Sequence, residues 1–155
     1  MCTVVIDTNV LIAATEDLDN AARGAINLVN QGEITACASR PILDEYQSLI
    51  PQRVAAEEVC RELQGFFARV KLVRLPRHTD PARCEDQEDE KFVQCARAVD
   101  ADYLITQDRH LLDLENIGTT HVVTPQKFLL GVKHMKDPAG KREWAAWVRQ
   151  IMGSR

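Results

Sequence analysis

Short apolar runs alternate along this chain with longer segments in which apolar residues recur at helical spacing. The short runs are rich in β-branched or small side chains, which is typical of buried strands; they cover residues 3–6, 34–38, 70–75, 103–106 and 122–123. The segments with a period near 3.6 predict helices at residues 10–14, 20–29, 41–50 and 54–69, then one that follows from the acidic run 85–90 and extends through 99, and others at 109–114 and from 125 onward. Because strands that alternate with helices form right-handed crossovers, the pattern predicts an α/β fold, a three-layer α/β/α sandwich with a central parallel sheet.

Helix ends are marked by residues with known capping behaviour. Gly32 is placed to stop the helix at 20–29, and Ser39 is a good N-cap for the helix that Pro41 opens. Pro51 ends that helix, because a residue before proline is disfavoured in helical geometry.

The length of 155 residues suits one domain, and no composition shift divides the chain. We expect a single domain over 1–155, with a core at 3–128 and a helical tail at 129–155. The tail carries Trp144 and Trp147 on one amphipathic face, which serves a dimer or simply covers the core.

Composition indicates a cytoplasmic protein that is not membrane-bound. No apolar run reaches the ~18 residues of a membrane span, and no signal peptide is visible. The five cysteines are odd in number and lack a CxxC pair, which favours a reducing compartment. The net charge of −4 excludes a basic DNA-wrapping protein, but locally clustered basic residues or a bound cation still permit nucleic-acid binding.

Two acidic residues follow predicted strands directly. Asp7 comes after the strand at 3–6, and Asp108 comes two residues after the strand at 103–106. Since the carboxyl ends of parallel strands share one edge of a sheet, and ligands bind outside that edge, both are candidates for one site.

The helix at 41–50 supplies a third candidate. Its apolar stripe consists of Ile42, Leu43, Tyr46, Leu49 and Ile50. At about 100° per residue, Asp44 lies nearly opposite the stripe and faces water, whereas Glu45 lies on its border. Glu45 is therefore the residue expected to reach the strand ends.

A fourth acid comes from the acidic run 85–90. The stripe of the following helix places Asp89 nearer the buried face than Glu90, but the helix can begin at these very residues, so both stay candidates. Clustered carboxylates repel one another unless a cation neutralises them, and Mg²⁺ or Mn²⁺ is the usual partner of oxygen ligands. Such a metal can activate a water for attack on a phosphodiester.

Each acid also has an ordinary structural interpretation. Taken singly, Asp7 and Asp108 are typical helix caps, while Glu45 and the acidic run are typical solvated surfaces. Thr8, Asn9 and Thr106 stand beside the acids, where they either hydrogen-bond carboxylates and metal waters or serve turns and caps.

Basic residues near the predicted element ends are candidates for phosphate contacts. They are Arg40, Arg74, Arg77 and Arg109. Such contacts make nucleic-acid binding salt-sensitive, although any one of these residues can equally be a solvated surface charge.

Several segments resemble, in order, the motifs of the PIN-domain family of metal-dependent ribonucleases. Residues 5–12 (VIDTNVLI) are similar to its opening motif, and 43–46 (LDEY) to the helix with its second acid. Residues 86–92 and 101–108 (ADYLITQD) are similar to the segments with its third and fourth acids. The likeness covers about residues 4–128 and is strongest to the VapC-like subgroup, the toxins of toxin–antitoxin pairs.

The resemblance implies an endoribonuclease whose catalytic and metal-binding acids are Asp7, Glu45, Glu90 and Asp108, with Asp89 as a substitute third ligand. It also implies Mg²⁺ or Mn²⁺ as cofactor, RNA as substrate, a homodimer and an antitoxin partner. Glu90 stands where the family usually has Asp, which favours an alternative: a non-catalytic module that binds RNA or protein. A phosphatase with an aspartyl nucleophile is disfavoured, since Asn9 replaces the second Asp that it needs.

Overall fold

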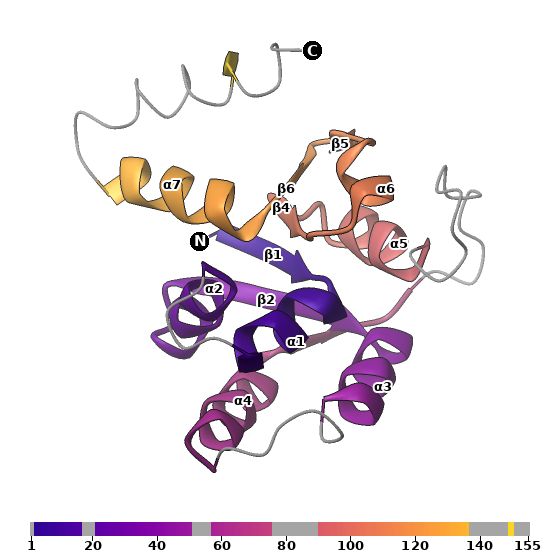
Figure 1. The fold of residues 1–155 in the computed structure, drawn as a ribbon. Helices are drawn as coiled ribbons and strands as arrows, with labels where there is room; N and C mark the ends of the chain where they lie inside the picture. The colour runs from indigo at the N-terminus through magenta and orange to yellow at the C-terminus, as the bar shows by residue number, and fades with distance from the viewer. Residues whose placement is uncertain (1, 17–20, 51–56, 76–89, 137–148, 151–155) are drawn as a thin grey trace.

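A computed structural model of the chain describes residues 2–16, 21–50, 57–75, 90–136 and 149–150 (Figure 1). Its strands are β1 (Cys2–Ile6), β2 (Ile34–Ser39), β3 (Lys71–Val73), β4 (Tyr103–Ile105), β5 (Asn116–Ile117) and β6 (Thr120–Val123). Its helices are α1 (Thr8–Glu16), α2 (Ala21–Asn30), α3 (Arg40–Leu49), α4 (Glu57–Arg69), α5 (Glu90–Ala98), α6 (Arg109–Leu112) and α7 (Pro125–Lys136). Most of the acidic run and most of the tail lie outside the described residues.

The strands form one six-stranded sheet in the order β3-β2-β1-β4-β6-β5. All neighbouring pairs are parallel except β5 and β6, which form an antiparallel hairpin. The predicted parallel sheet is therefore confirmed for the four pairings that join β3, β2, β1, β4 and β6, and the prediction missed β5. This strand has only two residues and turns at Gly118, whose φ is +60°, so it is too short to show any periodicity.

Helices cover both faces of the sheet, as the three-layer prediction requires. The chain moves from β1 through β2 to β3 in one direction, and then returns through α5 to β4 on the other side of β1. Because crossovers are right-handed, this reversal puts α5 on the opposite face from α2. Helix α2 packs against α4 and α7, whereas α5 packs against β1, β2 and β4 (Figure 1).

The predicted helix ends are partly confirmed. Gly32 follows α2 with a φ of +75°, the left-handed geometry that a glycine stop provides. Ser39 occupies the N-cap position of α3, but its hydroxyl makes no capping hydrogen bond, so the predicted side-chain cap is wrong. The Ser39 side chain is instead buried, and its Oγ has no hydrogen-bond partner among the described residues.

The core lies between the sheet and the two helical layers. Strand residues such as Val4, Val5, Leu104 and Ile105 have no exposed surface, as expected for a parallel sheet buried on both faces. Helix α2 approaches α7 closely at Gly24, where an added Cβ would lie 2.7 Å from Leu129 Cδ1. No helix in the described part of the chain is long and apolar enough to cross a membrane.

Candidate metal and nucleic-acid site

The strand order reverses between β1 and β4, which makes their carboxyl ends the switch point of the sheet. Strands β2 and β3 continue the sheet beyond β1, while β6 and β5 continue it beyond β4. Ile6 pairs with Ile105, so the next residues, Asp7 and Thr106, leave the sheet side by side. The crevice at such a point is where open α/β sheets bind ligands.

Asp7 is an ionisable side chain held inside the protein. It is 2% exposed; its Oδ2 accepts a hydrogen bond from Thr106 Oγ1 at 2.7 Å, and its Oδ1 accepts from the Asn9 backbone N–H at 3.4 Å. Burial raises the pKa of Asp7 above its usual value, and the charges of Asp108 and Glu45 raise it further, against the lowering effect of those two hydrogen bonds. The site therefore concentrates negative charge around a poorly hydrated carboxylate.

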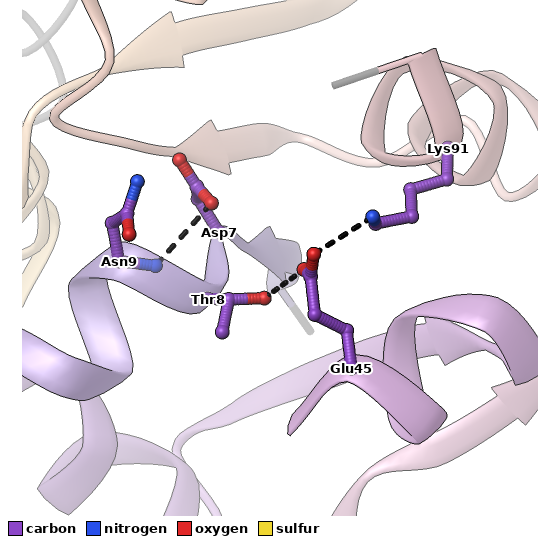
Figure 2. A network of polar contacts seen from close by, with 5 residues as sticks. All are labelled: Asp7, Thr8, Asn9, Glu45 and Lys91. Carbon is purple, nitrogen blue, oxygen red and sulfur yellow. Dashed lines mark hydrogen bonds and ion pairs between the residues drawn. The ribbon is translucent and has the colours of Figure 1, made fainter. Parts of the chain in front are cut away.

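Glu45 enters the site from α3, where both of its carboxylate oxygens have partners (Figure 2). Thr8 donates its hydroxyl hydrogen to Oε2, and Lys91 Nζ lies 2.8 Å from Oε1. Asp44, one residue earlier, has a 59% exposed side chain that pairs with Arg40 at 3.3 Å. The orientation expected from the helical stripe, Asp44 towards water and Glu45 towards the strand ends, is confirmed.

Asp108 serves partly as the helix cap that its ordinary interpretation predicts. Its Oδ1 accepts a hydrogen bond of 2.8 Å from the His110 backbone N–H at the start of α6. Its own backbone N–H donates to Thr106 Oγ1 at 2.9 Å. Thr106 thus joins Asp7 and Asp108 through a single hydroxyl.

The described contacts do not decide between Glu90 and Asp89. Glu90 is the first residue of α5 and is half-buried, whereas Asp89 lies outside the described residues. The residue of this segment that reaches Glu45 is Lys91, which the sequence analysis did not single out. A signal was present, because Lys91 is the first basic residue after the acidic run.

Tyr46, which was predicted only as part of the apolar stripe of its helix, also contributes to the site. Its ring is buried, and its hydroxyl donates to the backbone carbonyl oxygen of Ile6 at the end of β1. This bond attaches α3 to the strand that carries Asp7, and it thereby helps to set the position of Glu45.

The chemistry of the acidic side chains fits a hard divalent cation, but their present arrangement does not yet form its coordination shell. Asp7, Glu45 and Asp108 offer carboxylate oxygens, which suit Mg²⁺ and Mn²⁺. Within the part of the chain that the structure describes, no three acidic, histidine or cysteine side chains are close enough together to hold an ion. Glu45 is paired with Lys91 instead.

The candidate phosphate-binding residues follow strands at the same edge. Arg40 comes directly after β2, Arg74 directly after β3, and Arg109 opens α6 after β4. All three are exposed, while Arg77 lies outside the described residues. The basic residues and the acidic site thus share the carboxyl edge of the sheet.

A comparison with protein-family models shows to which family this chain is related. The family model for the PIN domain matches residues 3–110, well over half of the chain. This chain belongs to the PIN-domain family. The match begins in β1 and ends just beyond Asp108, so it covers every candidate acid of this PIN domain.

The fold of this PIN domain is similar to that of a solved structure at low sequence identity. The structure of VapBC2 from Rickettsia felis, bound to a DNA fragment from their promoter, matches with a TM-score of 0.52 and 16% identity over 77% of this chain and 96% of that chain. The PIN domain of T. brucei RRP44 matches with a TM-score of 0.46 and 14% identity over 87% of this chain and 83% of that one. A comparison with curated proteins finds no match.

Proposed function

We propose that this PIN domain is a metal-dependent endoribonuclease that acts in the cytoplasm. The observation that supports this most is Asp7, a carboxylate that is 2% exposed and has a raised pKa at the switch point of the sheet. Strongly perturbed carboxylates in such a position are typical of functional sites. PIN domains are generally nucleases, which favours a phosphodiester as the substrate.

In this proposal Asp7, Glu45 and Asp108, with Glu90 or Asp89 as the fourth acid, hold Mg²⁺ or Mn²⁺. The bound ion would supply an activated water and neutralise charge that develops on the phosphate. Thr106 and Thr8 orient the carboxylates of Asp7 and Glu45, and the Asn9 backbone N–H supports Asp7.

The RNA would be held by basic residues around the acidic site. Arg40, Arg74 and Arg109 lie at the same edge of the sheet, and Arg77 joins them by its place in the sequence. These contacts position the RNA backbone and carry no sequence information by themselves.

The test is cleavage of a panel of structured and single-stranded RNAs in Mn²⁺, Mg²⁺ or EDTA. Wild type should cut in the presence of a metal, and Asp7→Asn should lose activity by at least about 100-fold, because one carboxylate ligand becomes a neutral amide. Asp100→Asn is the matched control, since Asp100 is an exposed carboxylate before β4, at the opposite edge of the sheet. Full activity of Asp7→Asn would refute the assignment.

A non-catalytic PIN-like module that binds RNA or protein is the second candidate. The pairing of Glu45 with Lys91 favours it, because one potential ligand is already neutralised without a metal. Thermal shift separates the two functions: a nuclease of this type should gain stability with Mn²⁺, whereas the module need not. A folded protein with neither a Mn²⁺ shift nor cleavage would support the module.

The proposal extends to the toxin of a toxin–antitoxin pair, with an antitoxin partner and a homodimer. Its support is the motif likeness to the VapC-like subgroup. Induced expression should arrest growth, co-expression of the antitoxin should relieve it, and Asp7→Asn should be harmless. Light scattering on the purified chain tests the dimer, and a monomeric mass at micromolar concentration would contradict it.

A further inference from the structure

Lys91 places a positive charge against Glu45, a carboxylate that the proposed metal would need as a ligand. Its ammonium lies 2.8 Å from Glu45 Oε1, and both side chains are largely buried, at 22% and 24% exposure (Figure 2). Thr8 holds the other carboxylate oxygen. Each carboxylate oxygen of Glu45 therefore has a partner in the protein alone.

The remainder of the site explains why a cation belongs there. Asp7 is buried, and the charges of Asp108 and Glu45 both act on it, so the negative charges of the site repel one another at Asp7. An ammonium on a flexible stem lowers this repulsion while the protein has no metal. It is also tethered to α5, so it remains close when it leaves the carboxylate.

A divalent cation and this ammonium exclude each other at Glu45. Both are positive and both are attracted to the Glu45 carboxylate, and at a few ångströms their repulsion is strong in a partly buried site. Metal ligation through Glu45 Oε1 consequently requires the ion pair with Lys91 to open.

We propose that Lys91 is a tethered counter-cation, a positioning residue that occupies the cation position at Glu45 and competes with the divalent metal for it. This inference rests on the proposed function, since it assumes a metal that Glu45 ligates. Its consequence is that Lys91 stabilises the metal-free protein and weakens metal binding.

The experiment is a calorimetric titration of Mn²⁺ into the metal-stripped full chain at one pH. Lys91→Met keeps the length of the side chain and removes its charge, so it should lower the Mn²⁺ Kd by about threefold to tenfold. Lys91→Arg retains the charge and should stay within about twofold of wild type. Arg97→Met is the matched control, because Arg97 is an exposed cation on the same helix; it too should stay within about twofold.

Thermal melts give a second readout, independent of cleavage. In EDTA, Lys91→Met should melt below wild type, because Glu45 loses its partner, and saturating Mn²⁺ should remove the difference. Lys91→Gln, a second uncharged variant, replaces Lys91→Met in both measurements if the latter fails to fold.

An unchanged or higher Kd in Lys91→Met, or an equal decrease in Arg97→Met, would overturn the inference while leaving the metal site intact. Absence of Mn²⁺ binding in both wild type and Lys91→Met would overturn the inference together with the proposed metal-dependent function. The two failures are thereby distinguished.

Discussion

Asp7 is the residue at which fold stability and the proposed function oppose each other. Its carboxylate is buried among acidic neighbours, and two hydrogen bonds only partly compensate for the lost hydration. A buried ionised group of this kind costs stability unless a cation is bound. The residue is therefore expected to make the protein less stable without metal.

Asp7→Asn should raise the melting temperature of the protein in EDTA at pH 7.5. The amide keeps the shape of the side chain and removes its charge, and each ~1 kcal/mol of relieved repulsion corresponds to about 2–4 °C for a chain of this size. The same variant should gain less from Mn²⁺ than wild type does. A lower melting temperature in EDTA would show that the two hydrogen bonds of Asp7 outweigh its charge.

The stability gap between wild type and Asp7→Asn should depend on pH. The native pKa of Asp7 is raised above the ordinary 3.8, so the native state binds this proton more tightly than the unfolded chain. The contribution of Asp7 to the free energy of unfolding is then greatest below its unfolded pKa. This contribution is lost as pH rises through the raised native pKa. Melts in EDTA from pH 7.5 downward should show the gap closing; a gap independent of pH would contradict the raised pKa.

Asp44 and Glu45 offer a comparison of two adjacent acids on one helix. Glu45→Gln should reduce RNA cleavage by about 10-fold or more, because Glu45 faces the site, whereas Asp44→Asn should change it less than about twofold. Initial rates at saturating Mn²⁺ measure both. Equal losses in the two variants would show that net charge, and not position, controls activity.

At the scale of elements, the site depends on how α3 is attached to the sheet. The β1–β4 register brings Asp7 beside Thr106, whereas the sheet places only the start of α3, which follows β2 directly, and Glu45 lies more than one turn further on. The hydrogen bond from Tyr46 to Ile6 makes that connection, and Phe66 and Phe67 of α4 pack around the Tyr46 ring.

Tyr46→Phe should destabilise the protein by about 1 kcal/mol, because it removes a buried donor from a backbone carbonyl. Denaturant melts in EDTA measure this, and Ser48→Ala, an exposed change on the same helix, serves as the control. We also expect weaker Mn²⁺ binding, since α3 carries Glu45. Unchanged stability would mean that the hydroxyl contributes nothing to the attachment of α3.

At the scale of the whole molecule, the proposed function requires a protein with a net negative charge to bind RNA, which is itself a polyanion. The net charge is −4, and the candidate site adds clustered carboxylates. Arg40, Arg74 and Arg109, all at the carboxyl edge of the sheet, are the described residues suited to offset this locally. Attraction that depends on a few phosphate contacts should be strongly sensitive to salt.

RNA binding should weaken with salt in proportion to the number of phosphates contacted, with a slope of about −0.7 per contact for single strands. Arg109→Gln should lower the magnitude of the slope by roughly one such step, and Arg97→Gln should not change it. Binding by the inactive Asp7→Asn variant between 50 and 200 mM salt, the range over which such slopes are usually resolved, provides the measurement. Equal slopes for both arginine variants would remove Arg109 from the RNA interface.

The strands, the layers around them and the acids that follow β1 and β4 were predictable from the amino-acid pattern alone. Buried parallel strands are continuous apolar runs, so β1 and β4 were visible locally, and Asp7 and Asp108 follow them in the chain. Helical periodicity likewise separated Glu45 from Asp44. The two-residue β5 was beyond such reasoning because it is too short to show a period, and the missing side-chain cap at Ser39 was beyond it because residue type alone does not report whether a hydroxyl makes its hydrogen bond.

The partners of these acids, by contrast, are set by the packing of the folded chain. Thr106 meets Asp7, Lys91 meets Glu45, and Tyr46 meets Ile6 across 99, 46 and 40 residues of chain, respectively. No periodicity records such contacts, since they arise from strand order and helix packing. The candidate acids were therefore predictable one by one, whereas the ammonium that neutralises Glu45 was not.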